Sequence, residues 1–225
     1  MSAPEAVIFD AYGTLFDVNA AMEAHARRLG DRWPRLSEEW RAKQLEYTWV
    51  RSLTGAAYHE DFWLCTRDAL DFVFARHGID DPALAKDLME SYRKLPVYPE
   101  VPATLAAIRE QGIATAILSN GTPGMLEAAA QAAGIASLVD EILSVEEVGT
   151  FKPDPRVYRL ATRQFGCPPD RLLFVSANAW DTQAAHAFNM RVARVNRAGA
   201  PDEYGLGAAG VAVLTDLSGL TDLLA

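Results

Sequence analysis

Residues 6–17 read AVIFDAYGTLFD, and this stretch decides the class of fold. It begins with an apolar run that ends in a single carboxylate, Asp10, with Gly13 and Thr14 close behind. A short apolar run bounded by turn residues is typical of a strand buried on both faces of a parallel sheet. Ligands bind at the carboxyl ends of such strands, so the pattern predicts that Asp10 lies at a functional edge.

The second half of the chain alternates short apolar runs with helical patterns, which indicates βαβ units and a parallel sheet. Thr122 and Asp154 are expected to cap helices, because each precedes a proline at the first helical position. Gly134 and Gly166 fall where those helices should end. The strand-like runs are IATAILS, EILSV, RLLFVSA and RVARV, and the helical patterns are TPGMLEAAAQAAG, DPRVYRLATRQFG and DTQAAHAFN.

A long helical stretch separates the first strand from the others. Two segments within it, LSEEWRAKQLEYTWVRSL and DFWLCTRDALDFVFARHG, repeat apolar residues at helical spacing. We therefore predict an α/β fold in which a Rossmann-like parallel sheet core, residues 1–17 and 98–225, carries an inserted helical subdomain, residues 18–97. The glycine-rich stretch 199–210 is expected to be a loop.

Composition and charge narrow the range of partners. The formal net charge of −9 and the lack of a basic stripe argue against nucleic acid. Asp10 interrupts the apolar run near the N-terminus, so neither a signal peptide nor a membrane span is expected. Cys65 and Cys167 show no metal-ligand spacing, which favours a reducing compartment and hence the cytoplasm.

Polar side chains follow several of the predicted strands and should meet at one edge of the sheet. Taken singly, each is more often a turn or helix-cap residue. Together they bring carboxylates, hydroxyls, amides and an ammonium group to one place, which indicates a functional site. These residues are Asp10, Thr14, Ser119, Asn120, Lys152, Ser176, Asn178 and Asp181.

The motifs that hold these residues resemble those of the haloacid dehalogenase superfamily, and more narrowly those of the L-2-haloacid dehalogenases. The resemblance is carried by FDAYGTLFD, LSNG, FKPDPRVY and VSANAWD, together with WRAKQLEYTWVRSL in the helical stretch. It implies that residues 18–97 form a cap, that the substrate is a small 2-haloacid and that the chain forms a homodimer. The family often has Ser-Ser-Asn where this chain has Ser176-Ala177-Asn178, and the matching functional serine, Ser176, is retained.

Tyr12 stands where the phosphatases of the superfamily have a carboxylate that acts as general acid. An alkoxide leaving group must be protonated as it departs, whereas a halide ion is a very weak base and needs no proton. Those phosphatases also bind Mg²⁺ through further carboxylates, but this chain offers Asn178 and one nearby carboxylate, Asp181. We therefore expect a dehalogenase that uses no metal and no other cofactor.

The expected reaction is nucleophilic catalysis in which Asp10 attacks the halogen-bearing carbon and water hydrolyses the resulting ester. Lys152 would keep Asp10 ionised. Asp181 would either orient Lys152 or act as base toward the water, and the sequence leaves both roles open. Ser119 is expected to bind the substrate carboxylate. The family pattern assigns further catalytic positions to Thr14, Arg41, Tyr158, Ser176 and Asn178.

The leaving halide needs its own binding site. By the resemblance, Arg41 binds the departing anion together with Asn120 and Trp180. Taken alone, an arginine on a helix is most often solvated, and an aromatic residue at helical spacing most often belongs to the core. The predicted apolar wall consists of Tyr12, Leu45, Phe62 and Trp180. No strand-end motif contains any of the histidines, which are His25, His59, His77 and His186.

The predicted activity is conversion of short L-2-haloacids to D-2-hydroxyacids. Inversion follows from a single backside displacement at the chiral carbon, while the preference for the L form comes from the resemblance. Two alternatives stay open: a Mg²⁺-dependent small-molecule phosphatase of the same superfamily, and an inactive protein of the same fold that binds a small acid. Halogen preference and acid chain length depend on pocket dimensions, which no motif reports.

Overall fold

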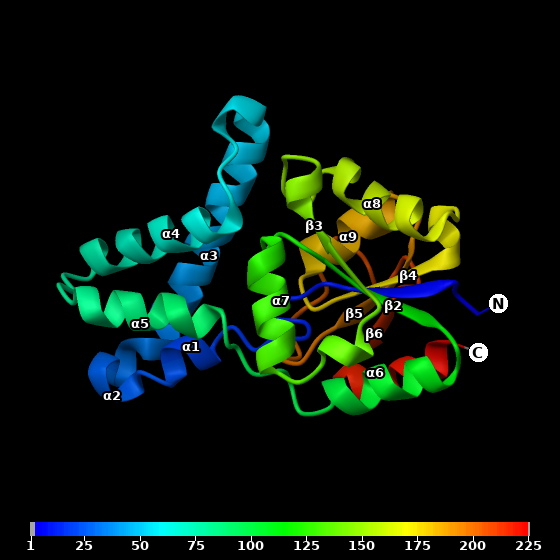
Figure 1. The fold of residues 1–225 in the computed structure, drawn as a ribbon, viewed down its shortest axis with the longest axis horizontal. Coiled ribbons are helices and arrows are strands. Elements are labelled where there is room, and N and C mark those ends of the chain that lie inside the picture. Colours follow the sequence, from blue (N-terminus) through cyan, green and yellow to red (C-terminus); the bar gives the residue numbers. More distant parts are fainter. Residues whose placement is uncertain (1–2, 225) are drawn as a thin grey trace.

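The computed structural model describes residues 3–224, and a parallel sheet forms its core (Figure 1). The sheet has six strands in the order β3-β2-β1-β4-β5-β6. They are β1 (Ala6–Phe9), β2 (Ala114–Ser119), β3 (Glu141–Ser144), β4 (Leu172–Ser176), β5 (Arg191–Val195) and β6 (Ala212–Leu214). The predicted α/β fold class is confirmed. Of the predicted core segments, residues 1–2 and 225 lie outside the described residues.

The strand order reverses at β1, because the chain builds β2 and β3 on one side of it and β4, β5 and β6 on the other. Helices α6 (Val101–Glu110) and α7 (Pro123–Ala132) connect the first group, while α8 (Pro155–Phe165) and α9 (Ala179–Ala187) connect the second. In Figure 1, α8 and α9 lie above the sheet, and α6 lies below it beside the C-terminal 3₁₀ segment (Leu217–Leu223). Ligands of open α/β sheets bind at such a reversal point.

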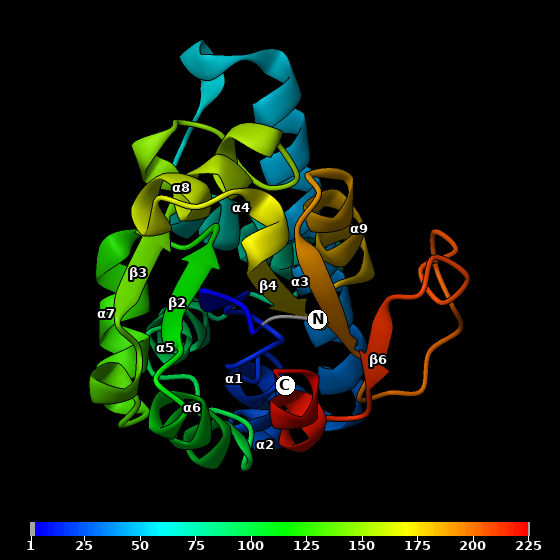
Figure 2. The same cartoon turned by 90° about the vertical axis from the view of Figure 1, so that its right-hand side faces the viewer.

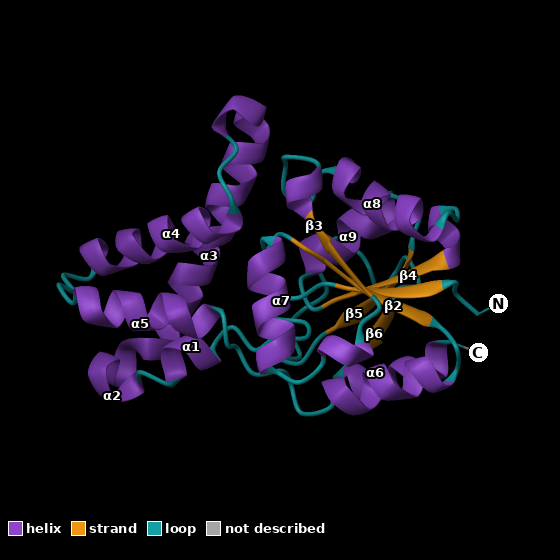
Figure 3. Cartoon of the chain, in the orientation of Figure 1, coloured by secondary structure: helices purple, strands orange, loops and turns teal. Residues whose placement is uncertain are grey.

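The stretch between β1 and α6 is helical, and Figure 3 shows it as a group of helices beside the sheet. The helices are α1 (Ala20–Glu23), α2 (Ala26–Leu29), α3 (Trp33–Thr54), α4 (Phe62–Arg76) and α5 (Pro82–Tyr92). Helices α3 and α4 pack against each other, and the indole Nε1 of Trp40 donates to the carbonyl oxygen of Thr66 at 2.8 Å.

Helix ends follow the signals in the sequence. Thr122 Oγ1 accepts a hydrogen bond from the backbone N–H of Met125, and the Asp154 carboxylate accepts one from the backbone N–H of Arg156. Gly166 ends α8 in the left-handed conformation with φ of 60°, which glycine adopts without steric cost. The expected helix caps are therefore confirmed.

The connection from β5 to β6 is a long loop that extends away from the sheet edge in Figure 2. Leu206 anchors this loop, because its side chain is buried against Ala179 and Val211. The expectation of a loop over 199–210 is thus confirmed. Within the described part of the chain, none of the helices is long and apolar enough to cross a membrane.

Candidate active site

Asp10 directly follows β1, and hydrogen-bond donors surround its carboxylate. Thr14 donates to Oδ2 at 2.9 Å, Asn178 Nδ2 donates to the same oxygen at 2.8 Å, and Ser176 Oγ lies 3.2 Å from it. Lys152 Nζ donates to the other oxygen, Oδ1, at 3.2 Å. Because the residue is only 6% exposed, these donors replace the water that an ionised carboxylate would otherwise bind.

Neighbouring strands bring these donors together. Ser176 is the last residue of β4, which pairs directly with β1. Asn178 precedes α9 but does not cap it, because its side chain turns toward Asp10 and also donates to the carbonyl oxygen of Tyr12 at 3.3 Å. Thr14 Oγ1 accepts from the backbone N–H of Ala177 at 2.8 Å, so its own proton points to Asp10.

Lys152 lies between two buried carboxylates. Its Nζ is 3.2 Å from Asp10 and 2.8 Å from Oδ2 of Asp181, and it sits 4.8 Å from the centre of the Phe174 ring. Burial raises the pKa of Asp181 to about 6, although the Lys152 ammonium lowers it. The Tyr158 hydroxyl donates to Oδ1 of Asp181 at 2.6 Å, and burial raises the pKa of Tyr158, so this hydroxyl keeps its proton.

A cavity of about 10 Å³ lies in front of Asp10. A space of this size holds about one water. The Tyr12 ring packs against Phe62 and Tyr92 with ring centres 5.4 and 5.6 Å away. The residues lining the cavity are Asp10, Tyr12, Arg41, Leu45, Phe62, Ser119, Asn120, Lys152 and Trp180.

The helical insertion and the sheet domain meet at this cavity. Arg41 on α3 donates from Nη2 to the carbonyl oxygen of Tyr12 at 3.2 Å. Further along α3, Ser52 Oγ accepts a hydrogen bond from the backbone N–H of Phe151 at 3.0 Å, one residue before Lys152. These contacts tie the insertion to the segment that carries the ammonium group.

The segment after β2 is held in a close turn. Ser119 Oγ accepts from the backbone N–H of Gly121 at 3.1 Å, and Asn120 Oδ1 accepts from the backbone N–H of Lys152 at 2.9 Å. A Cβ on Gly121 would lie 3.0 Å from both the Tyr12 ring and the Leu126 side chain. The glycine therefore lets this turn approach the cavity wall.

The groups around Asp10 suit an anion better than a divalent cation. The amide nitrogen of Asn178 and the ammonium of Lys152 are hydrogen-bond donors, whereas Mg²⁺ requires oxygen ligands. Across residues 3–224, no cluster of three or more His, Cys, Asp or Glu side chains is suited to hold a metal ion.

Every predicted site residue lies either in the cavity wall or in the hydrogen-bond network behind Asp10. Gln44, whose buried amide contacts Arg41, was not among the predicted site residues. A signal was present, because Gln44 continues the buried stripe of α3, which also contains Leu36, Ser37, Trp40 and Thr48. A polar amide in such a stripe needs a buried hydrogen-bond partner.

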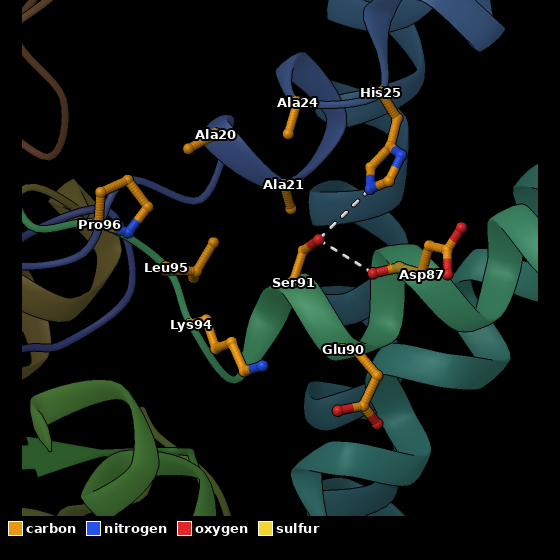
Figure 4. Close-up of a pocket in the computed structure, with 10 residues that line it drawn as sticks. All are labelled: Ala20, Ala21, Ala24, His25, Asp87, Glu90, Ser91, Lys94, Leu95 and Pro96. Carbon is orange, nitrogen blue, oxygen red and sulfur yellow. Dashed lines mark hydrogen bonds between the residues drawn. The ribbon is translucent and has the colours of Figure 1, made fainter. Parts of the chain in front are cut away.

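A larger cavity of about 490 Å³ lies between α1 and α5 and contains none of the predicted site residues (Figure 4). Its walls include His25, whose Nε2 is 3.5 Å from Ser91 Oγ, and Ser91 donates to the backbone carbonyl of Asp87. The Asp87 carboxylate pairs with Arg28 instead. These three residues therefore do not form a catalytic triad.

This chain is similar to known proteins over most of its length. The family described as haloacid dehalogenase-like hydrolase matches residues 4–189. The chain is 42% identical over 205 residues to (S)-2-haloacid dehalogenase 1 of Pseudomonas sp. (strain CBS-3), which covers 91% of this chain and 89% of that protein.

Solved structures show the same relationship. A crystal structure described as a dehalogenase with intermediate complex superposes with a TM-score of 0.95 at 38% identity, covering 100% of this chain and 99% of that one. The L-2-haloacid dehalogenase of Xanthobacter autotrophicus, with chloropropionic acid covalently bound, gives a TM-score of 0.85 at 34% identity over 98% of each chain. The chain therefore belongs to the haloacid dehalogenase-like hydrolase family.

Proposed function

We propose that this protein is a hydrolytic (S)-2-haloacid dehalogenase, which converts short L-2-haloacids to D-2-hydroxyacids and halide. The observation that carries the proposal is the asymmetric environment of Asp10. Thr14, Ser176 and Asn178 surround Oδ2, while Oδ1 faces Lys152 at the cavity. The names of the similar enzymes support the same enzyme class, a hydrolase acting on carbon–halide bonds.

In the first step, Oδ1 of Asp10 attacks C2 of the haloacid. The new bond between Oδ1 and C2 forms as the bond between C2 and the halogen breaks, and the halide leaves with the bonding electrons. The Lys152 ammonium lies 3.2 Å from Oδ1 and holds this oxygen at the cavity. Attack from the side opposite the halogen inverts C2, so an L substrate gives a D product.

In the second step, water attacks Cγ of Asp10 and the bond between Cγ and Oδ1 breaks. Lys152, whose Nζ lies 3.2 Å from Oδ1 and 2.8 Å from Asp181, passes the proton that Asp181 takes from the water to Oδ1, which leaves as the hydroxyl group of the hydroxyacid. Negative charge develops on Oδ2 as the water adds, before the bond between Cγ and Oδ1 breaks, and Thr14 and Asn178 already donate hydrogen bonds to Oδ2 at 2.9 and 2.8 Å. Donors placed in advance at a developing oxyanion are an effective source of catalysis. Asp181 takes the proton of the water, because it is the second carboxylate at Lys152 and is oriented by the Tyr158 hydroxyl.

We assign the substrate carboxylate to Ser119, whose Oγ lies in the cavity wall and follows β2. The halide lies on the opposite side, against Arg41, Asn120 and Trp180. A guanidinium group stabilises the charge that develops on the departing halide. Tyr12, Leu45 and Phe62 supply the apolar surface around C2 and its substituent.

A Mg²⁺-dependent phosphatase is the less suitable assignment. Tyr12 cannot protonate an alkoxide in the way a carboxylic acid does, because burial raises its pKa far above neutrality. The Asn178 amide points an N–H donor at Asp10, where a phosphatase would need a metal ligand. A silent acid-binding protein would have no use for a second buried carboxylate, Asp181, beside the same lysine.

Further properties belong to the same proposal. We assign residues 18–97 to a cap over the sheet domain, in line with its all-helical structure. A homodimer is proposed through the outer end of α3, where Val50 and Leu53 are exposed at 50% and 88%. The free thiols of Cys65 and Cys167 suit the cytoplasm.

The test is halide release from L- and D-2-chloropropionate in the presence of EDTA, with wild-type protein and the Asp10→Asn variant. We expect release from the L form alone, and none from the variant. Release that requires Mg²⁺, or hydrolysis of phosphate esters in its place, would contradict the proposal.

A further inference from the structure

Gln44 links three helices of the insertion behind the halide side of the cavity. Its side chain is fully buried, and its Oε1 accepts hydrogen bonds from Arg41 Nη1 at 2.6 Å and from the Tyr92 hydroxyl at 3.3 Å. Its Nε2 donates to Thr66 Oγ1 at 2.6 Å. The side-chain amide of Gln44, which holds Arg41, thus joins α3 to α4 and α5.

These bonds fix the orientation of the Gln44 amide. Thr66 Oγ1 donates its proton to the carbonyl oxygen of Phe62 at 2.6 Å, so this hydroxyl acts toward Gln44 as an acceptor. The Gln44 nitrogen must therefore face Thr66, and its oxygen must face Arg41. Arg41 is held at a second point by the carbonyl oxygen of Tyr12 at 3.2 Å.

The acceptors that hold Arg41 are neutral groups, namely the Gln44 amide oxygen, the Tyr12 carbonyl oxygen and the Tyr92 hydroxyl. A carboxylate at the place of Gln44 would neutralise the guanidinium, whereas an amide oxygen fixes its position and leaves its charge free to act on the cavity. The charge acts at short range in a buried site, where electrostatic interactions are stronger than in water. The arrangement suits a group that must stabilise an anion which appears only during the reaction.

We propose that Gln44 is a positioning residue for dehalogenation, which holds the Arg41 guanidinium toward the leaving halide without neutralising it. This assignment rests on the proposed function. It predicts that loss of Gln44 slows the departure of chloride more than the departure of bromide. Chloride is smaller than bromide, so an N–H donor approaches its charge more closely, and loss of the donor geometry harms chloride departure more.

The test uses Gln44→Met and Gln44→Glu, with L-2-chloropropionate and L-2-bromopropionate compared in single-turnover halide release. Gln44→Met removes the amide at similar volume, and Gln44→Glu keeps an acceptor but neutralises Arg41. For both variants we expect the chloride rate to fall roughly tenfold or more, as for loss of a hydrogen bond to a charged group. The bromide rate should fall less, so the bromide-to-chloride ratio rises.

Trp40→Phe is the matched control. It removes the buried hydrogen bond from Trp40 to the Thr66 carbonyl in the same helix pair and leaves the side-chain hydrogen bonds of Arg41 and Gln44 in place. This variant should lower the melting temperature and leave the bromide-to-chloride ratio unchanged. If Gln44→Met does not fold, Thr66→Val gives an independent measurement. This variant removes the acceptor of the Gln44 nitrogen and so frees the amide to turn, and it should also raise the bromide-to-chloride ratio.

If the Gln44 and Thr66 variants slow halide release by the same factor with both substrates, Gln44 has only a structural role and the assignment is overturned. A wild-type rate in Gln44→Glu would overturn the requirement for a neutral acceptor. Absence of halide release from the wild type with either substrate would instead refute the proposed function, and the assignment of Gln44 would fall with it.

Discussion

Lys152→Met removes the cation that lies between the two buried carboxylates. The variant keeps the backbone N–H that donates to Asn120, so the segment should hold its position. At 3.2 Å from Asp10 and an effective dielectric constant of about 20, the ammonium contributes attraction on the order of 5 kcal/mol. Without the ammonium, the Asp10 carboxylate and the anionic haloacid meet with no cation beside the attacking oxygen, so we expect halide release to fall by more than about tenfold.

The same change should make stability depend more steeply on pH. The pKa of Asp181 is raised to about 6 in the fold, and Lys152 lowers it, so removal of Lys152 raises it further. A raised pKa favours the folded state at low pH, and this contribution is lost as the pH rises through the folded pKa. Loss of one partner of a buried ion pair costs about 3–5 kcal/mol. We expect this loss in full at pH 8 and a smaller loss at pH 5.

Denaturant unfolding at both pH values and single-turnover halide release measure the two effects. Lys94→Met, which removes an exposed lysine, is the matched control and should alter neither quantity. Equal destabilisation at pH 5 and pH 8, or halide release within about tenfold of the wild type, would refute the assigned role of Lys152.

Asp181→Asn should release one halide per active site and then stop, because no base remains to activate the water. Intact-protein mass spectrometry should show the ester on Asp10, and continued turnover would count against the role of Asp181. The kcat of the wild type should fall as the pH drops below about 6, where Asp181 becomes protonated, and a flat steady-state profile from pH 5 to 8 would contradict this. Tyr12→Phe should raise the free energy of unfolding by about 1–2 kcal/mol in denaturant titrations, because the Tyr12 hydroxyl is buried and finds no hydrogen-bond partner within residues 3–224; a loss of stability would reveal a contact that this hydroxyl makes. Halide release should be unchanged by EDTA. A loss of halide release in EDTA that added Mg²⁺ reverses would contradict the assignment of the site.

The fold and the membership of the site were predictable because parallel strands converge at one edge. AVIFD, IATAILS and RLLFVSA each read as a buried strand followed by polar residues, and the sheet order places β2 and β4 on either side of β1. Asp10, Ser119 and Ser176 therefore lie near one another whatever the details of the connecting helices.

Contacts made by the insertion could not be predicted in the same way. Gln44 and Ser52 act through side-chain orientations that depend on how α3 packs against α4 and the sheet domain. The small volume of the cavity depends on the same packing. Strand β6 was also missed, because Ala212–Leu214 is only three residues long and lies partly exposed at the sheet edge.

Under the proposed mechanism, Asp10 itself supplies the oxygen of the product hydroxyl group. A single turnover of L-2-chloropropionate with excess enzyme in heavy-oxygen water tests it directly. We expect the heavy oxygen to enter the Asp10 carboxylate and to be found in the peptide containing it, while the hydroxyacid keeps ordinary oxygen. Heavy oxygen in the hydroxyacid and none in that peptide would rule out attack by Asp10, because water would then have displaced the halide directly.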